Sequence, residues 1–351
     1  MMRAIALISK KSLQHNLKKV YKFAPNSKVI AMVKGNSYGH HNKLVVKNLN
    51  NCDIFAVTQI TEAYEVRKYT DKPILLILSD VFKDINYIDN VEFVVHCEQQ
   101  LRNILNIKKH IKIWLKIDTG MSRLGFSPER LEYWLNKLSK NPNIEIKAIM
   151  SHFACADDIG NAFNKRQLSI FNKYTPSKLK KSIANSAAII TIPESHFDFV
   201  RPGIMLYGIS PFGINNKSID IDLKPVMKLM APIICVKKIK KGHSVGYGQT
   251  WVSDKNTTIA LIAIGYRDGY PRHAKIGTPV LINNKRHSLI GRVSMDIICV
   301  DIVNTKVNIG DMATLWGDEK LTAEEVAYCS ETIGYELTSN ISNRVKFVLD
   351  N

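Results

Sequence analysis

The chain has 351 residues, 45% of them hydrophobic, and its 49 Lys and Arg residues against 31 Asp and Glu give a formal net charge of +18. This composition excludes a disordered chain, and the length suffices for two domains. The basic residues are spread along the sequence in pairs, without a basic tail or a zinc-finger, bZIP or RNA-recognition pattern. We therefore expect neither nucleic acid nor a membrane as a partner.

The apolar runs of the sequence are all short. The opening MMRAIALISKK has a shorter apolar run than the core of a signal peptide and no small-residue cleavage site. Runs such as PILLIL and IALIAI have the length of strands and are too short to span a bilayer. The cysteines at 52, 97, 155, 235, 299 and 329 form no CxxC pair, which is typical of reduced thiols in a cytoplasmic protein.

Short apolar runs follow one another through the first 205 residues, with stretches of helical spacing between them. Strands that alternate with helices indicate a parallel sheet, and about eight such units in some 200 residues fit a closed barrel better than an open sheet. We predict an N-terminal (β/α)8 TIM-like barrel over residues 1–222. Its strands are expected at 28–33, 53–57, 73–78, 91–95, 112–117, 146–150, 181–184 and 197–200.

Helical spacing is found at 41–50, 61–69, 97–109 and 127–140. The last of these begins with Ser127 and Pro128, an N-cap residue type followed by a first-turn proline.

After residue 222 the sequence is rich in strand-forming runs separated by Gly, Asn and Asp turns, which predicts a mostly-β C-terminal domain over 223–351. Only 322–334 has a helical pattern, with Thr322 and Glu325 spaced as a capping box. The strands are expected at 231–239, 257–265, 278–284, 295–303 and 311–316.

In a barrel, reactive side chains stand just past the C-terminal ends of the strands. Polar strand ends are common and account for Thr58 and Ser79, but they account less well for the lysine, histidines, asparagine and arginine together. The residues at these positions are Lys34, Thr58, Ser79, His96, Asp118, His152, Asn185 and Arg201.

Two loops late in the predicted barrel, ANSAA at 184–188 and RPGIMLYG at 201–208, lie where barrels often bind phosphate. Asn185 and Ser186 offer amide and hydroxyl groups at a helix start, and Gly203 lets backbone N–H groups approach an anion. Either loop alone is a weak signal, but both in the expected place indicate a phosphate site.

A lysine that can form a Schiff base, with a phosphate site opposite, describes a pyridoxal phosphate site. Lys34 would be that lysine. Arg201 would face the pyridine nitrogen and leave it unprotonated, because arginine keeps its own proton. The weaker electron withdrawal suits simple removal and return of a proton. His152 could stack beside the ring, although a lone histidine at a strand end is as often structural.

These features resemble the alanine racemases, bacterial pyridoxal-phosphate enzymes with an N-terminal barrel and a C-terminal β domain. The similarity runs in order over nearly the whole chain. Its motifs are VKGNSYGH (33–40), LKIDTGMSRLGF (115–126), SHFACAD (151–157), ANSAA (184–188), RPGIMLYG (201–208), VGYGQTW (245–251), IGYRDGYPR (264–272), GRVSMD (291–296) and ISNRV (341–345).

The resemblance implies a set of cofactor contacts. Lys34 would hold pyridoxal 5'-phosphate covalently and Arg201 would face its ring nitrogen. The remaining cofactor residues would be Tyr38, His152, Asn185, Ser186, Gly203, Ile204 and Tyr335.

The resemblance also implies two catalytic bases, Lys34 and Tyr247, because racemisation removes the α-proton from one face and returns a proton to the other. Arg123 would lower the pKa of the tyrosine by its nearby positive charge. Lys116 would carry a carbamate that orients Arg123. An unmodified lysine or a chloride in that place is the alternative.

The substrate-binding residues that the resemblance implies are Arg123 of the barrel and Met295 and Asp296 of the second domain. Met295 and Asp296 match the segment that holds the substrate carboxylate, and Tyr266 matches an entrance residue. The resemblance implies that this domain completes the active site of a partner subunit, so that a homodimer with composite sites acts on alanine without a metal. His41 departs from a common glycine of the family, and Arg267 departs from a common small residue.

The function implied is interconversion of L-alanine and D-alanine, which supplies D-alanine for peptidoglycan. A racemase of the same fold acting on serine, on basic amino acids or on a broader range is the nearest alternative. A decarboxylase with a similar barrel would need a carboxylate at the pyridine nitrogen, and Arg201 argues against it. A basic nucleic-acid binder is the alternative from a different class.

Overall fold

A computed structural model of the chain describes residues 3–78, 88–303 and 305–350. Its contacts divide the chain into two compact units, which are described separately here. The barrel unit comprises Leu17–Ser37 and Val45–Leu206. The β unit comprises Met1–Asn16, Tyr38–Leu44 and Tyr207–Asn351, so it includes two N-terminal segments.

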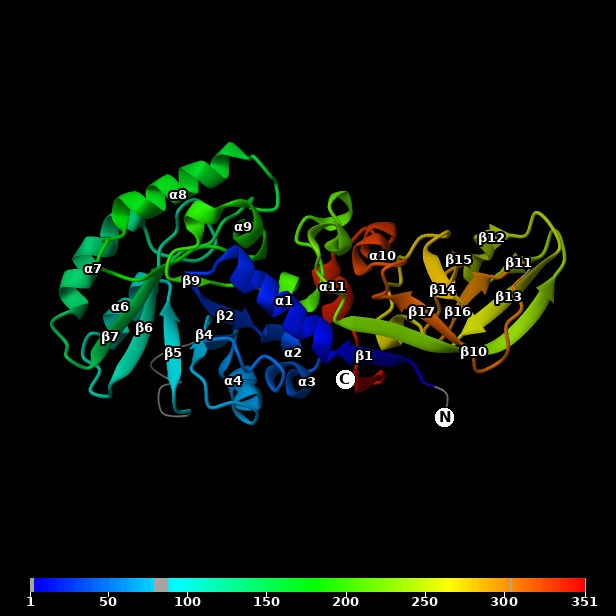
Figure 1. Cartoon of the computed structure of the whole chain (residues 1–351), viewed down its shortest axis with the longest axis horizontal. Coiled ribbons are helices and arrows are strands. Elements are labelled where there is room, and N and C mark those ends of the chain that lie inside the picture. The colour runs from blue at the N-terminus through cyan, green and yellow to red at the C-terminus, as the bar shows by residue number, and fades with distance from the viewer. Residues whose placement is uncertain (1–2, 79–87, 304, 351) are drawn as a thin grey trace. The chain divides into compact units, whose positions relative to one another are not determined.

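The barrel unit contains an eight-stranded parallel sheet in the order β8-β7-β6-β5-β4-β3-β2-β9 (Figure 1). Its ends, β8 and β9, meet through a bond from Ser182 Oγ to the Phe199 carbonyl at 2.9 Å, so the barrel is nearly closed. All eight predicted strands are confirmed. They are β2 (Lys28–Met32), β3 (Ile54–Val57), β4 (Ile74–Leu76), β5 (Val91–Val95), β6 (Ile111–Lys116), β7 (Ile144–Met150), β8 (Lys181–Ser182) and β9 (Phe199–Val200).

The barrel strands are apolar because helices cover a parallel sheet on its outer face while side chains fill its interior. Every residue of β3, β4 and β5 is buried. The interior includes the fully buried Trp114, whose ring lies 4.8 Å from that of Phe199. Its Nε1–H donates to the buried Glu92 carboxylate at 2.5 Å, which satisfies a polar pair inside an apolar core.

The described helices between the strands confirm the predicted helical stretches. Ser127 is the N-cap and Pro128 the first residue of η1, as predicted, but the Ser127 hydroxyl donates to Glu129 instead of accepting a backbone N–H. The elements are α1 (Lys10–Phe23), α2 (Lys34–Tyr38), α3 (Asn42–Val46), α4 (Ile60–Arg67), α6 (Glu98–Ile104), η1 (Pro128–Arg130), α7 (Leu131–Leu138), α8 (Ala162–Tyr174), α9 (Ser186–Thr191) and η2 (Pro193–Ser195). Of these, α2 is a left-handed turn and not a right-handed helix.

The β unit is built on a second sheet, in which β13, β16, β15, β14, β17 and β10 close into a ring because β13 also pairs with β10. β1 pairs with the N-terminal part of β10, which β13 leaves unpaired, and β18 adds to β1, while β11 and β12 form a separate hairpin. The strands are β1 (Ile5–Ser9), β10 (Met227–Ile239), β11 (Ser244–Val245), β12 (Trp251–Val252), β13 (Thr257–Ile262), β14 (Pro279–Ile282), β15 (Lys285–Ile290), β16 (Ile298–Asp301), β17 (Met312–Trp316) and β18 (Lys346–Asp350).

Within the described residues, two α-helices, α10 (Ala323–Cys329) and α11 (Gly334–Ser339), accompany this sheet, and the sequence pattern predicted the first. The Thr322 hydroxyl accepts the backbone N–H of Glu325, as expected of the N-cap, while the Glu325 carboxylate accepts from Arg286 at 2.5 and 2.7 Å. The helical elements are η3 (Ile204–Tyr207), η4 (Gly213–Asn215), η5 (Ser218–Ile221), η6 (Tyr247–Gln249), η7 (Tyr266–Asp268), α10 (Ala323–Cys329) and α11 (Gly334–Ser339).

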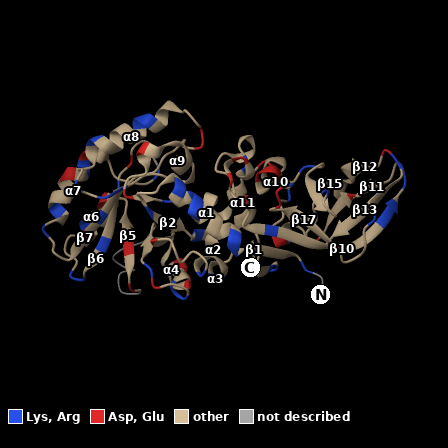
Figure 2. Cartoon of the chain, viewed as in Figure 1, with Lys and Arg blue, Asp and Glu red and all other residues tan. Residues whose placement is uncertain are grey.

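Lys and Arg residues occur on helices and strands of both units, in keeping with their even spread along the sequence (Figure 2). Within the described residues, we find no helix with both the length and the apolar character needed to cross a bilayer.

His41, the departure from a glycine common in the family that the sequence resembles, adopts a left-handed backbone with φ 71°. An L-residue in this region costs about 1–2 kcal/mol, whereas glycine adopts it freely. Relief of this strain in His41→Gly should raise the free energy of unfolding. Because glycine also gains entropy in the unfolded chain, which offsets part of the gain, we expect a net increase of up to about 1 kcal/mol. The measurement is the thermal unfolding midpoint. His41→Ala, which removes the ring but keeps the strain, is the control, and an equal loss of stability in both variants would contradict the prediction.

Candidate active site

Lys34 opens a left-handed turn directly after β2. Gly35, Asn36, Ser37 and Tyr38 have φ values of 59°, 53°, 58° and 51°. The Ser37 N–H donates to the Val33 carbonyl at 2.9 Å, which closes the turn. Glycine and asparagine are the residues that enter this region most readily, so the Gly-Asn pair explains why the strand can turn in this way. The turn ends the strand and leaves the Lys34 side chain accessible at the barrel mouth.

The surroundings of Lys34 favour its neutral amine. Partial burial of the amine lowers the pKa of Lys34, and the positive charge of Arg123 lowers it further. The Glu62 carboxylate acts in the opposite direction. A lowered pKa makes more of the nucleophilic form available near neutral pH.

Lys116, at the end of β6, is the most deeply buried lysine of the mouth, with 6% of its surface exposed. Burial, followed by the charges of Arg201 and Arg123, lowers its pKa to about 8, while Asp118 partly opposes the shift. Positive charge therefore exceeds negative charge around this amine. Such a site favours the neutral amine or an anion that compensates the cations.

Arg201 follows β9 and is 5% exposed. Its Nη1 donates to Ser182 Oγ and its Nη2 to the Ser151 carbonyl, both at 2.6 Å. Burial lowers its pKa to about 10, so the guanidinium remains charged at neutral pH. These bonds use Nη1 and Nη2, and Nε–H therefore remains to serve a further acceptor.

His152 follows β7 and is held neutral beside Arg201. Its pKa lies well below the usual value, chiefly because the ring is buried and next because of the Arg201 charge. Nη2 of Arg201 lies 3.2 Å from His152 Nδ1. Because a guanidinium can only donate, a bond between these two atoms requires Nδ1 to accept and the ring proton to sit on Nε2. The Ile183 carbonyl, also 3.2 Å from Nη2, competes for the same N–H.

Hydrogen bonds from its backbone N–H groups hold the loop that carries Arg123. Oδ1 of Asp118 accepts the N–H groups of Gly120 and Ser122 at 2.9 and 3.1 Å. Gly125 donates to the His96 carbonyl at 3.1 Å. A Cβ on Gly125, whose φ is 124°, would lie 2.6 Å from the Asp118 nitrogen, so this position requires glycine. The exposed Arg123 is thus presented by an ordered loop.

Gln167 on α8 is a residue of the barrel mouth that the sequence did not single out. It is fully buried, and its Nε2 donates to the His152 carbonyl at 3.0 Å and to Thr119 Oγ1 at 3.2 Å. Its Oε1 accepts the Ala154 N–H at 2.9 Å. One side chain therefore joins the loops after β6 and β7.

The predicted phosphate loops meet through Ser186. Its Oγ accepts the N–H of Gly203 at 2.8 Å and that of Met205 at 3.4 Å, so the hydroxyl proton is available to donate. Asn185 is the N-cap of α9 and its side-chain oxygen accepts the Ala188 N–H at 3.0 Å. The Gly203 N–H therefore donates to a side chain of the protein, whereas the sequence analysis expected it to face a bound anion.

The other strand-end residues have more local partners. The Thr58 N–H donates to Glu62 Oε2 at 2.7 Å. Burial and the Lys116 charge lower the pKa of His96. Ser79 lies outside the described residues.

Within the β unit, Tyr38 packs between two other tyrosines. Its ring centroid lies 5.0 Å from that of Tyr207 and 6.0 Å from that of Tyr335. A Cβ on the following Gly39, at φ 81°, would lie 1.9 Å from the Thr338 carbonyl oxygen. The chain after Tyr38 is therefore packed tightly against α11.

Tyr247 lies between β11 and β12 and is 69% exposed. The glycines on either side, Gly246 and Gly248, have φ values of 82° and 69°. This backbone presents the phenol at the surface of the β unit.

Tyr266, Met295 and Asp296 come from two loops of the β unit that pack together. The N–H of Tyr266 donates to the Ser294 carbonyl and that of Arg267 to the Met295 carbonyl, both at 3.1 Å. Tyr266 and Met295 are 41% and 45% exposed. Asp296 pairs with Arg344 Nη1 at 2.7 Å.

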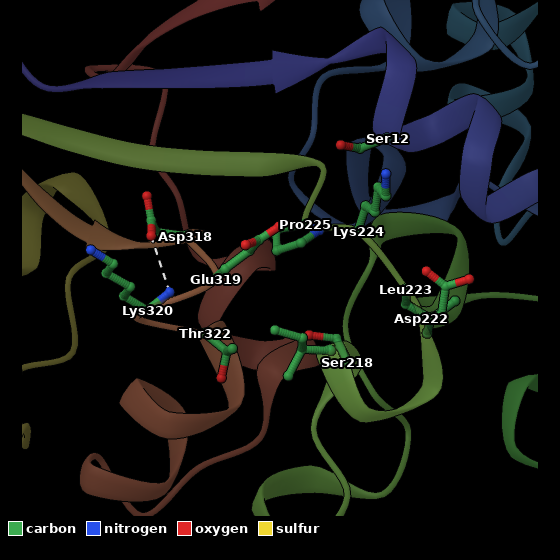
Figure 3. Close-up of a pocket in the computed structure, with 12 residues that line it drawn as sticks. Ser12, Ser218, Asp222, Leu223, Lys224, Pro225, Asp318, Glu319, Lys320 and Thr322 are labelled. Carbon is green, nitrogen blue, oxygen red and sulfur yellow. Dashed lines mark hydrogen bonds between the residues drawn. The ribbon is translucent and has the colours of Figure 1, made fainter. Parts of the chain in front are cut away.

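A pocket of about 400 Å³ in the β unit does not involve the predicted site (Figure 3). Charges of both signs line it, among them Asp222, Lys224 and Glu319. The backbone N–H of Lys320 donates to Asp318 Oδ1 at 3.0 Å. Among the described residues that line this pocket, none belongs to the predicted set of site residues.

Comparison with known proteins identifies the family. The family model for the alanine racemase N-terminal domain matches residues 8–211, and the model for the C-terminal domain matches residues 226–349. The alanine racemase of Vesicomyosocius okutanii subsp. Calyptogena okutanii (strain HA) is 53% identical over 99% of both chains. That of Vibrio vulnificus (strain CMCP6) is 42% identical over 99% of both chains.

The fold comparison agrees with the sequence comparison. The biosynthetic alanine racemase of Pseudomonas aeruginosa superimposes with a TM-score of 0.94 at 36% identity, over 100% of both chains. The alanine racemase of Acinetobacter baumannii gives a TM-score of 0.93 at 37% identity, again over 100% of both chains. The chain described here belongs to the alanine racemase family.

Proposed function

We propose that this chain interconverts L-alanine and D-alanine by two-base catalysis with pyridoxal 5'-phosphate, in the cytoplasm, and supplies D-alanine for peptidoglycan. The observation that carries the proposal is the group of cations around Lys34, whose own pKa is lowered by burial and by Arg123. Relatives named as biosynthetic alanine racemases, such as that of Escherichia coli O6:H1 at 40% identity, support the biosynthetic role.

The residues of the barrel mouth fit an anionic cofactor that binds a lysine. The charges of Arg201, Arg123 and Lys34 all act on Lys116, and that of Arg123 also acts on Lys34. The opposing acids are Asp118 at Lys116 and Glu62 at Lys34, and they compensate this positive charge only in part. Lys34 would hold the cofactor covalently. The hydroxyl of Ser186, which can donate, would bind the phosphate together with Asn185, Tyr38 and Tyr335. The Gly203–Ile204 backbone would contribute through the Ile204 N–H, since the Gly203 N–H donates to Ser186.

When bound, pyridoxal phosphate withdraws electrons from the α-carbon of an attached amino acid and so lowers the barrier to loss of its α-proton. Arg201 would donate its Nε–H to the ring nitrogen. Because a guanidinium with a pKa near 10 does not release a proton at neutral pH, it would not protonate that nitrogen. The neutral His152 would lie beside the ring without adding charge.

Lys34 and Tyr247 would move the proton on the two faces of the α-carbon, one accepting while the other donates. In this proposal the tyrosine comes from the β domain, residues 223–351, of a partner subunit and the lysine from the barrel domain, residues 1–222. The high exposure of Tyr247 supports a role at a subunit interface. The active unit would then be a homodimer with composite sites.

Arg123 would stand next to the catalytic phenol and favour its anionic form by its positive charge. A carbamate on Lys116 would hold Arg123 by a bidentate pair. Carbamate forms from carbon dioxide and a neutral amine, and the Lys116 pKa of about 8 supports its formation. Met295 and Asp296 would bind the substrate carboxylate through their backbone region, and Tyr266 would line the entrance.

The first prediction concerns Lys34. We expect Lys34→Ala to purify without the visible absorption band of lysine-bound cofactor, because the mutated side chain cannot form the covalent link. Lys18→Ala, on an exposed position of α1, should keep the band at wild-type intensity. An unchanged spectrum in the Lys34 variant would disprove the assignment.

The second concerns Tyr247 and the reaction itself. In deuterated water the wild-type protein should convert L-alanine to D-alanine with deuterium at the α-carbon, and should act far less on L-serine and L-lysine. Tyr247→Phe should keep the cofactor but lose about 100-fold or more in kcat/KM, because it lacks one proton carrier. The loss should be equal from either isomer, since the two enantiomers have the same free energy. Tyr328→Phe, which is 66% exposed in the same unit, serves as control. Loss of cofactor in the Tyr247 variant would instead indicate a structural role.

The third concerns Lys116. Carbamate should form from the neutral amine, and its pKa of about 8 makes the neutral fraction about tenfold larger at pH 9 than at pH 7. We expect ¹³C from labelled bicarbonate to enter the carbamate about tenfold faster at pH 9 than at pH 7, after division of each initial rate by the concentration of dissolved carbon dioxide. The incorporation is followed by NMR. Lys116→Met should show no signal at that position. A wild-type spectrum without a carbamate resonance would contradict the proposal.

A further inference from the structure

Glu62, in the first turn of α4, makes backbone contacts with two different loops of the barrel mouth. Its Oε1 accepts the N–H of Gly35 at 2.6 Å. Its Oε2 accepts the N–H of Thr58 at 2.7 Å and that of Gln59 at 3.2 Å. Gly35 belongs to the turn that follows β2, while Thr58 follows β3.

Helix capping explains only part of this arrangement. An acid three residues after the N-cap Gln59 commonly accepts the N-cap N–H, and Oε2 has that role here. The bond from Oε1 to Gly35 lies outside the helix and is the shortest of the three contacts. A second function, directed at the Lys34 turn, is needed to account for it.

The Lys34 turn needs external contacts to keep its shape. Asn36 and Ser37 are L-residues in the left-handed region, which is disfavoured for them, and such a backbone persists where the surroundings hold it. Ser37 is fully buried on one side of the turn. The Glu62 carboxylate supplies a charge-assisted hydrogen bond to Gly35, at the start of the same turn.

We propose that Glu62 is a positioning residue for Lys34: its carboxylate ties the left-handed turn to the end of β3 and so fixes the direction in which the lysine enters the barrel mouth. The consequence for catalysis rests on the function proposed above, whereas the tie itself can be measured without it. The negative charge of Glu62 also opposes the lowering of the Lys34 pKa by burial and by Arg123. Loss of the carboxylate should therefore change both the geometry and the titration of this amine.

The variants are chosen to separate positioning from capping. Glu62→Ala removes all three contacts. Glu62→Gln keeps the size of the side chain but replaces one carboxylate oxygen by an NH₂ group. That group is itself a donor and cannot accept the N–H that the lost oxygen bound. Glu65→Gln is the matched control on the same helix, since Glu65 is exposed and pairs with Lys68 at 2.5 Å.

The first measurement is hydrogen exchange at the amides of Gly35 and Thr58 in the purified full-length protein. We expect faster exchange at both amides in Glu62→Ala and at one or both in Glu62→Gln, with no change in the control. The second is the pH dependence of Lys34 acylation in protein freed of cofactor. Its midpoint should shift to lower pH in both Glu62 variants, because a negative charge near the amine is lost.

The third measurement is the kinetics of alanine racemisation. Glu62→Ala should lower kcat about tenfold or more while KM changes less, because a displaced catalytic group costs rate chiefly in the transition state. Glu62→Gln should be intermediate. Unchanged exchange at Gly35, or an unchanged kcat despite faster exchange, would overturn the proposal. If the wild-type protein does not racemise alanine, the proposed function fails, and exchange and acylation then decide the positioning role alone.

Discussion

The buried positive charge of Arg201 lies where β8 and β9, the two end strands of the barrel sheet, meet. Its guanidinium bonds the hydroxyl of Ser182 at the end of β8 and the carbonyl of Ser151 after β7, while its own backbone N–H donates to the Ala184 carbonyl at 3.0 Å. These contacts hold together the strand ends that β8 and β9 bring to the mouth. Leaving a buried hydrogen-bonding group without its partner typically costs about 1–3 kcal/mol, and more for a charged group. The contacts at the closure of the barrel and the charge in its mouth therefore depend on the same residue.

That charge determines the chemistry of its neighbours. After burial, which is the larger cause for both groups, it lowers the pKa of Lys116 and of His152, and with Arg123 it leaves the mouth with an excess of positive charge. A phosphate-bearing cofactor would compensate this excess, so the protein would be expected to gain stability on binding it. The same excess favours neutral amines at Lys34 and Lys116. The structural and the chemical roles of the buried arginine are therefore linked.

The sequence predicted the barrel strands because buried parallel strands are continuous apolar runs between helices. It missed β15, KRHSLI, whose first four residues are charged or polar and of which only the last two are buried. It also missed β1, because its partners β10 and β18 lie more than two hundred residues away. Strand-end logic located Lys34 and Arg201, whereas Gln167 and Glu62 lie on helices, where such residues are ordinary and only tertiary contacts reveal their partners.

The two proposed bases share a feature that no residue-type pattern reveals. Lys34 precedes four successive left-handed residues, and Tyr247 lies between two glycines of positive φ with Gln249, at φ 49°, shortly after. A left-handed backbone has few alternative conformations once its contacts are made, so it fixes the direction of the attached side chain. Racemisation requires each base to stay on its own face of the α-carbon. In each unit, therefore, the backbone around the proposed base is the part of the structure that would keep it there.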